Sequence, residues 1–334
     1  MEYRQLGATG VRVSELCLGT MTFGREADEA AACAIVDRFF EAGGNFVDTA
    51  NNYGDPPGRS ESILGDVLSG RRDQVVLATK VRFATGDGVN DRGLSRRHIR
   101  LQCDASLRRL GTDWIDLYQV HSWDPTCPLE ETLSALDDLV RDGKVRYVGA
   151  SNFAGWQLAK ALGVAAVHGW EPFVSLQPTY SLVTRDIERE LLPLCRADGI
   201  AVMPYGPLAG GLLSGKYHQD EAPAPDTRAG GDEITRRGMA FRMTEHGFSI
   251  ARVVETVADA AGRTPSQVAL NWVLTRAGVT APILGVRTTE QLDDNLGAVG
   301  WRLDPEHEAL LDEASRITLG YPHNFHTWMA ELGI

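Results

Sequence analysis

The sequence predicts one α/β domain of 334 residues whose eight strand–helix units close into a (β/α)8 TIM barrel. Short apolar segments of strand length alternate with longer segments of helical spacing along most of the chain. Eight strand segments can be counted, which is the number that closes a parallel barrel. A polar residue or a glycine stands at the end of each of them. No internal repeat or interdomain linker is visible, so we expect a single domain over residues 1–334.

The strands follow a short N-terminal hairpin. Tyr3–Leu6 and Val11–Ser14 flank the turn Gly7–Gly10, which is typical of two antiparallel strands. The eight barrel strands are expected at Leu16–Leu18, Asn45–Asp48, Val75–Lys80, Ile115–His121, Val145–Ala150, Val174–Gln177, Ala201–Tyr205 and Pro282–Gly285.

Helical spacing fills the segments between the strands. The first helix is expected to begin after Asp28 as N-cap and to stop at Gly43. Apolar positions recur at three- and four-residue steps in this helix, in a second one after Ser95 and in a third segment: Ala32, Ile35, Val36, Phe39 and Phe40; Ile99, Cys103, Leu107 and Leu110; Leu129, Leu133, Leu136 and Val140. Two further helices are expected near Ser249–Ala261 and Pro265–Thr275.

The longest interruption runs from about Gly206 to Gly247. Its centre, Gln219–Asp226, is polar and rich in proline. Because a loop of this length is usually functional or disordered, we interpret it as a lid over a cofactor or substrate.

Composition excludes several classes of partner. The formal charge of −12 argues against nucleic acid or an anionic membrane as partner. The five scattered cysteines contain no Cys-x-x-Cys pair, which indicates buried thiols in a reduced compartment and neither disulfides nor a metal site. The N-terminus lacks the apolar stretch of a signal peptide, and no uncharged run reaches the roughly 18 residues of a membrane span. We therefore expect a cytoplasmic protein.

The strand ends carry residues suited to carbonyl chemistry. An acid, an amine and an imidazole end the second, third and fourth strands, as Asp48, Lys80 and His121, and a phenol, Tyr53, follows the second. Together these groups can hold a carbonyl oxygen and give it a proton. Parallel barrels place their chemistry at this end of the strands.

Four motifs give the chain a resemblance to a known family. Gly44–Gly54, Ala78–Lys80, Gln119–His121 and Gly149–Phe153 resemble the aldo-keto reductase superfamily, in the same order and over residues 3 to about 301. The chain looks closest to the bacterial branch that includes aryl-alcohol-dehydrogenase-like and sugar-related reductases. The resemblance implies NADPH-dependent reduction of an aldehyde or ketone by a tetrad of Asp48, Tyr53, Lys80 and His121.

Each member of the tetrad has a separate expected role. Before desolvation opposes it, an ammonium ~4 Å from a phenol favours the phenolate by about 4 kcal/mol at an effective dielectric near 20, or roughly three pKa units, so Lys80 is expected to bring the pKa of Tyr53 toward working pH. Asp48 would keep Lys80 charged. His121, when neutral, would donate a hydrogen bond to the substrate oxygen.

No dinucleotide-binding Gly-x-Gly-x-x-Gly follows a strand in this sequence. The cofactor-binding residues are therefore those that the family resemblance implies. The segment Gly210–Tyr217 fits a triphosphate-binding loop except at Tyr217, which cannot hold magnesium, so a nucleotide triphosphatase is rejected. Tyr205 would stack on the nicotinamide, Arg228 would close over the pyrophosphate, and Arg287 would meet the 2′-phosphate, favouring NADP over NAD. The full expected set is Gly19, Thr20, Met21, Asp48, Ser151, Asn152, Gln177, Tyr205, Gly206, Pro207, Leu208, Gly210, Lys216, Arg228, Gly285, Arg287, Gln291, Asp294 and Asn295. Asp294 departs from the family, where a longer Glu is usual.

The substrate pocket is expected beside the tetrad. Its lining would be Met21, Tyr53, Phe83, His121 and Trp123, and the aromatic tail Tyr321–Trp328 would cap the mouth, as C-terminal segments do in the family, or form an interface. Two other functions stay open at this point. One is a nicotinamide-binding regulatory subunit with weak turnover, and the other is reduction of a sugar enone. A homo-oligomer is also compatible with the sequence.

Overall fold

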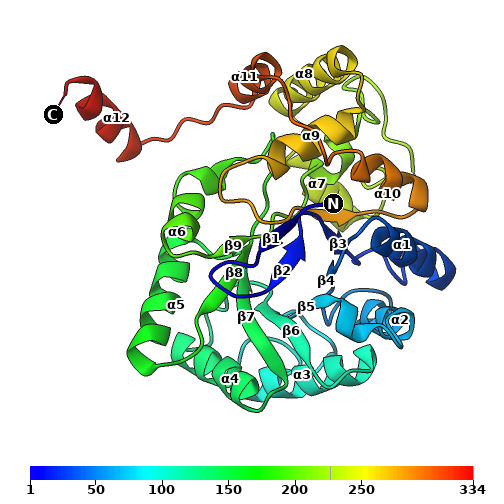
Figure 1. The fold of residues 1–334 in the computed structure, drawn as a ribbon, viewed down its shortest axis with the longest axis vertical. Helices are drawn as coiled ribbons and strands as arrows, with labels where there is room; N and C mark the ends of the chain where they lie inside the picture. Colours follow the sequence, from blue (N-terminus) through cyan, green and yellow to red (C-terminus); the bar gives the residue numbers. More distant parts are fainter. Residues whose placement is uncertain (226, 334) are drawn as a thin grey trace.

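Eight parallel strands form a barrel surrounded by helices (Figure 1) in a computed structural model that describes residues 1–225 and 227–333. The strands neighbour one another in the order β10-β3-β4-β5-β6-β7-β8-β9. They are β3 (Cys17–Gly19), β4 (Phe46–Asp48), β5 (Val76–Val81), β6 (Ile115–Val120), β7 (Val145–Ser151), β8 (Phe173–Gln177), β9 (Ala201–Val202) and β10 (Ile283–Gly285). The predicted α/β barrel and all eight of its strands are thus confirmed.

Backbone hydrogen bonds close the sheet between its two outer strands. The amide of Thr280 donates to the carbonyl of Val202 at 2.8 Å, and the amide of Ile283 donates to Pro204 at 2.8 Å. Strand β9 ends at Val202 and not at Tyr205 as predicted. Pro204 has no N–H to contribute to a ladder, which accounts for the early end.

The N-terminal hairpin packs against one end of the barrel. Its strands β1 (Tyr3–Gln5) and β2 (Arg12–Ser14) are antiparallel, as predicted. Leu6 and Val13 are fully buried in a cluster with strand residues such as Phe46 and Leu117. The hairpin therefore seals this end, and the functional side chains must lie at the other.

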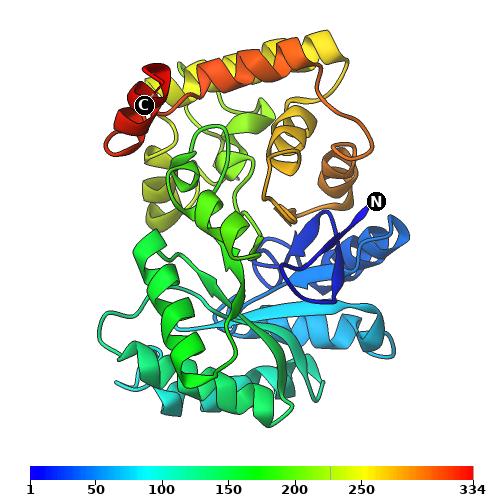
Figure 2. The same ribbon diagram turned by 60° about the vertical axis from the view of Figure 1, so that its left-hand side comes forward.

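The helices cover the outside of the barrel (Figure 2). They are α1 (Glu29–Glu41), α2 (Arg59–Val67), α3 (Arg96–Leu110), α4 (Leu129–Arg141), α5 (Gly155–His168), α6 (Leu191–Ala197), α8 (Glu245–Ala261), α9 (Pro265–Leu274), α10 (Thr289–Leu296) and α11 (Pro305–Ala314), with short 3-10 turns at Arg72–Gln74 (η1), Asp186–Glu188 (η2) and Ala209–Ser214 (η3). The predicted caps are present, because Asp28 accepts from the amide of Ala31 and Ser95 from that of His98.

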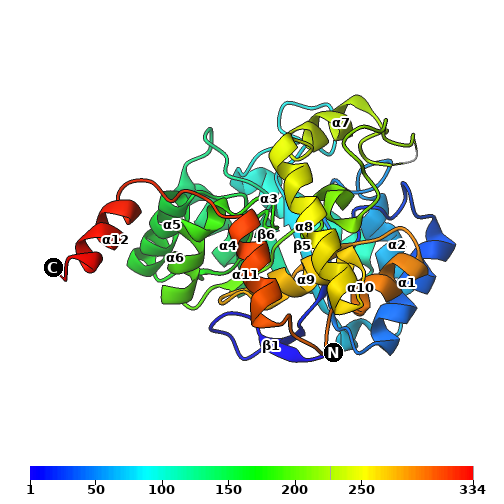
Figure 3. The same ribbon diagram turned by 90° about the horizontal axis from the view of Figure 1, so that it is seen from above.

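The long segment before α8 is partly helical. It contains η3 and α7 (Glu233–Ala240), and Figure 3 shows α7 on the opposite side of the barrel from β1. Helix α8 begins at Glu245, earlier than the predicted Ser249, because the hydroxyl of Thr244 caps it by accepting from the amide of Gly247. Asp226, the last residue of the predicted polar centre, lies outside the described residues.

The C-terminal tail ends in α12 (His323–Glu331), which stands away from the ring of helices at the end of an extended linker (Figure 1). None of its described side chains is buried. The linker is held by Arg189, whose Nη1 donates to the carbonyls of Thr318 and Leu319 at 2.6 and 2.8 Å. A cap over the barrel mouth thus stays a prediction.

The five cysteines are free thiols. Cys17, Cys103 and Cys195 are buried, but the prediction of buried thiols is wrong for Cys33, which is exposed, and for Cys127, which is half-buried. Cys33 follows the buried Ala32 on α1 and faces outward, because adjacent helical residues point to different sides. Among the described residues, no helix combines the length and the apolar character that crossing a membrane requires.

Candidate active site

Three of the four tetrad side chains project from neighbouring strand ends. Asp48 ends β4, Lys80 lies near the end of β5, and His121 follows β6. Tyr53 belongs to the turn after β4, where its carbonyl accepts from the amides of Gly58 and Ser60 at 3.0 and 3.2 Å. These bonds fix the start of α2 against the turn, so the phenol is brought back over the strand ends.

Lys80 and Asp48 form a buried ion pair inside the barrel. The Lys80 Nζ donates to Asp48 Oδ2 and, at 2.9 Å, to the carbonyl of Thr49. The other carboxylate oxygen of Asp48 accepts from the side-chain amides of Gln119 and Gln177 at 3.0 and 2.9 Å. Burial opposes the charge of Lys80, but Asp48 and Tyr53 outweigh it and raise the lysine pKa. Lys80 is therefore an ammonium at neutral pH.

Tyr53 lies between the lysine and the histidine. Its Oη is 3.4 Å from His121 Nε2, and Lys80 Nζ is 5.0 Å from the centre of its ring. Burial raises the pKa of Tyr53 above its usual value of 10.0 by more than Lys80 lowers it. The predicted fall of this pKa is wrong for this structure, because desolvation, which the prediction treated as the smaller effect, outweighs the ammonium. Tyr53 is consequently a protonated phenol at neutral pH.

His121 is a neutral imidazole. Burial, with the charges of Lys80 and Arg82, holds its pKa well below 6.5. The Asn152 side-chain amide donates to the His121 carbonyl at 2.9 Å and so fixes the backbone. Among the described residues no hydrogen-bond partner reaches its buried Nδ1, whereas Nε2 faces the Tyr53 hydroxyl. A proton on Nε2 would be directed at an oxygen placed beside Tyr53.

The residues expected at the nicotinamide end form one network next to the tetrad. The Tyr205 hydroxyl donates to Asn152 Oδ1 at 2.9 Å, and Asn152 adopts a left-handed φ of 55°. Ser151 Oγ donates to the Gln177 carbonyl at 2.8 Å. On the other side, Thr20 Oγ1 donates to the carbonyl of Asp48, and Met21 is exposed near the rim. Gly19 pairs with Asp48 and Gly285 in the sheet.

The expected pyrophosphate segment is a glycine turn beneath a cation. Gly206, Gly210 and Gly211 have φ values of 66°, 71° and 99°, which other residues rarely adopt. A Cβ at Gly211 would lie 2.3 Å from Cε of Lys216, so this amine folds over the turn. Pro207 and Leu208 complete the turn before η3. Open backbone beside an ammonium suits a phosphate group.

Arginines gather where the adenosine end is expected. An Nη atom of Arg228 lies 3.9 Å from the Cβ position of Gly285. Burial lowers the pKa of Arg228, and the nearby charges of Arg287 and Arg242 lower it further. The cluster suits a phosphate, and Arg242 was missed from the sequence because the long segment before α8, in which it lies, carries no motif at that position.

The remaining adenosine-end residues lie on α10. Its N-cap, Thr288, accepts from the amide of Gln291, whose side chain in turn accepts from the backbone amide of Arg287 at 2.9 Å. Asn295 is buried, and Asp294 Oδ1 accepts from Thr264 Oγ1 at 2.7 Å, so this carboxylate is engaged with the cap of α9. The contact expected between Asp294 and adenosine stays a prediction.

Aromatic rings extend outward from His121. Phe83 meets His121 edge to face at a centroid distance of 4.7 Å. Trp123 meets Phe153 and Trp156 at 5.4 and 5.6 Å. Trp156, in the first turn of α5, was missed because an aromatic residue at a helix start is indistinguishable from core packing until the rim is assembled.

A parallel barrel with a buried Lys–Asp pair, a protonated phenol and a neutral imidazole at one end defines a barrel oxidoreductase of the carbonyl-reducing type. The model of the Aldo/keto reductase family matches residues 15–316, so the chain belongs to that family.

Named relatives agree with this assignment. The chain is 43% identical to the oxidoreductase YrpG of Bacillus subtilis (strain 168), over 94% of this chain and 95% of the relative. It is 39% identical to norsolorinic acid reductase B of Aspergillus parasiticus, over 97% of this chain and 86% of the relative. Identity to the versiconal hemiacetal acetate reductase of Aspergillus parasiticus is 34%, over 94% and 96%.

Proposed function

We propose that the protein reduces an aldehyde or ketone with NADPH and that Tyr53 donates the proton. The observation that carries this proposal is the 3.4 Å separation of Tyr53 Oη and His121 Nε2 above the buried Lys80–Asp48 pair. An oxygen beside these two atoms would meet one proton donor and one hydrogen-bond donor. The cofactor, when bound, supplies the hydride.

Each residue of the tetrad has a separate role in the proposed reduction. Hydride adds to the carbonyl carbon, and the electron pair of the C=O bond moves to oxygen. Tyr53 gives its proton to that oxygen, and Lys80 stabilises the phenolate that is left. Asp48 keeps Lys80 charged and oriented. His121 stays neutral and donates a hydrogen bond to the same oxygen, which fixes the face of the carbonyl that meets the hydride.

NADPH is favoured over NADH by the arginine cluster. Burial lowers the pKa of Arg228, the charge of Glu26 raises it, and the charges of Arg287 and Arg242 lower it again, in a molecule whose overall charge is −12. A 2′-phosphate would relieve their mutual repulsion, and Arg287 would bind it. Ser151, Asn152 and Gln177 would hold the carboxamide, and Tyr205 would stack on the ring.

The regulatory-subunit and enone alternatives have less support. In the family, another residue at the position of His121 is a mark of weak carbonyl reduction, and Glu there marks reduction of a C=C bond in steroids. This chain has histidine at that position, and two of its relatives are named as reductases. A cytoplasmic location and a homo-oligomer stay predictions that cell fractionation and light scattering would test.

The first experiment follows NADPH absorbance with aromatic aldehydes, methylglyoxal and a keto-sugar. We expect turnover that falls by more than about 1,000-fold in Tyr53→Phe, because the proton donor is lost while the ring is kept. Binding of NADPH, followed by fluorescence, should be unchanged in this variant. Tight NADPH binding with no turnover of any carbonyl would support the regulatory subunit instead.

A second comparison tests the cofactor preference. Arg287→Met should weaken NADPH binding at least about tenfold and leave NADH binding nearly unchanged, because only NADPH carries the 2′-phosphate. Equal effects on both cofactors would remove Arg287 from this role.

A further inference from the structure

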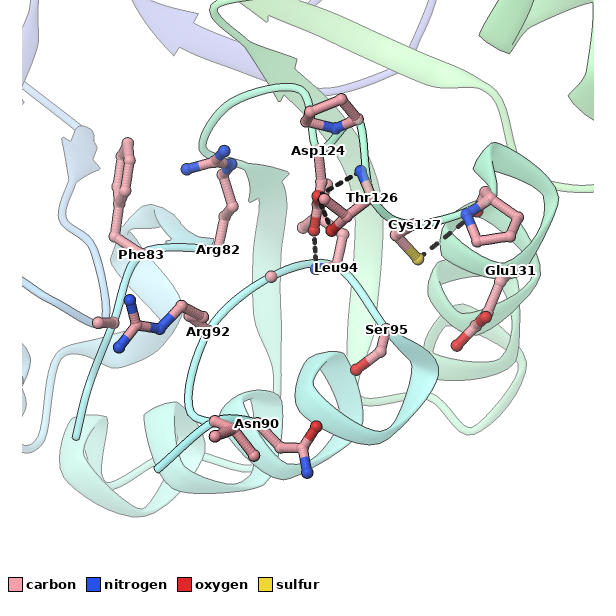
Figure 4. Close-up of a pocket in the computed structure, with 15 residues that line it drawn as sticks. Arg82, Phe83, Asn90, Arg92, Leu94, Ser95, Asp124, Thr126, Cys127 and Glu131 are labelled. Carbon is pink, nitrogen blue, oxygen red and sulfur yellow. Dashed lines mark hydrogen bonds between the residues drawn. The ribbon is translucent and has the colours of Figure 1, made fainter. Parts of the chain in front are cut away.

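A cavity of about 680 Å³ lies between the loop after β5 and the loop after β6 (Figure 4). Arg82, Phe83 and Arg92 come from the first loop, and Asp124, Thr126 and Glu131 lie on the other side. Phe83 belongs both to this cavity and to the immediate surroundings of His121, whose ring it meets at 4.7 Å. No tetrad side chain is among the described residues that line the cavity, and Phe83 is the lining residue that connects it to His121.

The acidic groups of the cavity are engaged by backbone and hydroxyl donors. Asp124 accepts from the Leu94 amide at 2.9 Å and from the amide and hydroxyl of Thr126 at 3.0 and 2.7 Å. Glu131 Oε1 accepts from the amide of Arg96 at 2.9 Å. Both carboxylates thus accept hydrogen bonds that hold the loop and the start of α3 in place around the cavity.

The basic groups of the cavity form no direct ion pair among the described residues, although the charge of Arg82 acts at longer range on Asp124 and helps to lower the pKa of that carboxyl. Arg82 donates through Nε to the Trp123 carbonyl at 3.2 Å, and its guanidinium carbon lies 5.0 Å from the centre of the Phe83 ring. Among the described residues, no carboxylate comes within 4.0 Å of the guanidinium of Arg82 or Arg92. Figure 4 shows both arginines on the same side of the cavity as Phe83. Arg82, which lies over Phe83 and forms no ion pair with a described carboxylate, is therefore a guanidinium near His121 that can meet an anionic ligand.

We propose that Arg82 determines specificity by binding an anionic group, a carboxylate or a sulfonate, on an aromatic carbonyl substrate. The substrate ring lies against Phe83, its carbonyl points to Tyr53 and His121, and its anionic group meets the guanidinium. Arginine suits this role because its planar donors can bind two oxygens of one anion. This inference rests on the proposed carbonyl reduction and names its substrate class.

The test compares matched aldehydes that differ in charge. 4-Formylbenzoate and 4-formylbenzenesulfonate carry an anion opposite the aldehyde, and methyl 4-formylbenzoate is the neutral control. The measured quantity is the ratio of kcat/KM for the anion to kcat/KM for the ester, which cancels any general effect on His121. We expect Arg82→Gln to lower this ratio by about tenfold or more, mainly through KM, and Arg97→Gln, an equal loss of charge on exposed α3 surface, to leave it unchanged.

Reversing the charge at position 82 should reverse the preference for the charge of the substrate. Arg82→Glu should make a cationic aldehyde, 4-formyl-N,N,N-trimethylanilinium, a better substrate than 4-formylbenzoate. A ratio that stays the same in Arg82→Gln, or that falls equally in Arg97→Gln, would overturn the proposal.

A binding measurement separates this inference from the proposed reaction. Benzoate and benzamide are unreactive, and tryptophan fluorescence reports their binding to the protein with NADP⁺. Benzoate should bind more tightly than benzamide, and Arg82→Gln should abolish the difference. If the wild-type protein reduces no aldehyde but shows this preference, the reaction is wrong and the anion site stands. Equal binding of both ligands would remove the site.

Discussion

At the scale of single residues, the charge states of Tyr53 and His121 determine how reduction should depend on pH. Reduction requires the protonated phenol, whose pKa is raised above 10.0 by burial, so activity is present below that pKa and lost as pH rises through it. His121, whose pKa is held well below 6.5, becomes protonated only in acid, and activity should fall there. We expect kcat at saturating NADPH to vary by less than about twofold between roughly pH 6.5 and 9. An alkaline fall near about pH 8 would show that Lys80 outweighs burial after all.

The Lys80–Asp48 pair should contribute to stability as well as to catalysis. Lys80→Met leaves a buried carboxylate with only two amide donors, which should lower the free energy of unfolding by about 3–5 kcal/mol in urea titration. Adding Asp48→Asn removes the stranded charge and keeps an oxygen for Gln119 and Gln177. The double variant should therefore be more stable than Lys80→Met alone, and equal stabilities would contradict this account.

Residue types at strand ends were enough to predict which polar side chains meet at one end of the barrel. Asp48, Lys80, Tyr53 and His121 could be placed there because their strands are parallel and neighbouring. The pKa of Tyr53 could not be predicted, because its burial arises from neighbours on several elements. Arg242 and Trp156 were missed for the same reason, since each reaches the site from a segment whose position only the assembled fold defines.

At the scale of elements, Arg4 links the hairpin to the closing seam of the barrel by hydrogen bonds. Arg4 Nη1 donates to the carbonyls of Leu274 and Val279, each at 3.0 Å. Arg4→Met should lower the free energy of unfolding by about 1.5–3 kcal/mol, because carbonyls lose charged donors in a partly buried place. Chemical denaturation would measure this change. Arg12→Met, on the exposed side of the same hairpin, is the control and should change stability by less than about 0.5 kcal/mol.

Element positions were predictable from apolar spacing, whereas several ends were not. The buried positions Ile35, Val36 and Phe39 marked α1, because one helix face must contact the barrel. Strand β9 and helix α8 differ from prediction at their ends, where a proline and a threonine cap decide the boundary. Such ends depend on single hydrogen bonds, which apolar periodicity does not report.

At the scale of the whole molecule, charge is distributed unevenly. The chain carries −12 overall, yet Arg242 and Arg287 lie near Arg228, Lys216 lies at the glycine turn of Gly211, and Arg82 lines the proposed substrate cavity. The acidic exterior would repel an anionic cofactor at long range, and these cations would capture it at short range. Local arrangement of charge, more than net charge, would thus account for the proposed binding of anions.

Removing the C-terminal tail would test whether the stability, the oligomeric state or the substrate binding of the protein depends on it. Truncation after Gly320 removes α12, whose described side chains are exposed, and keeps the contacts of Arg189 with Thr318 and Leu319. We expect the free energy of unfolding to change by less than about 0.5 kcal/mol, in a single transition if residues 1–320 form one domain. Light scattering and the KM for an aromatic aldehyde would be measured on the same sample. A lower oligomeric state would assign the aromatic residues Phe325 and Trp328 to an interface, and a raised KM without change of mass would place the tail over the barrel mouth. If neither the oligomeric state nor the KM changes, α12 is needed for neither assembly nor substrate binding.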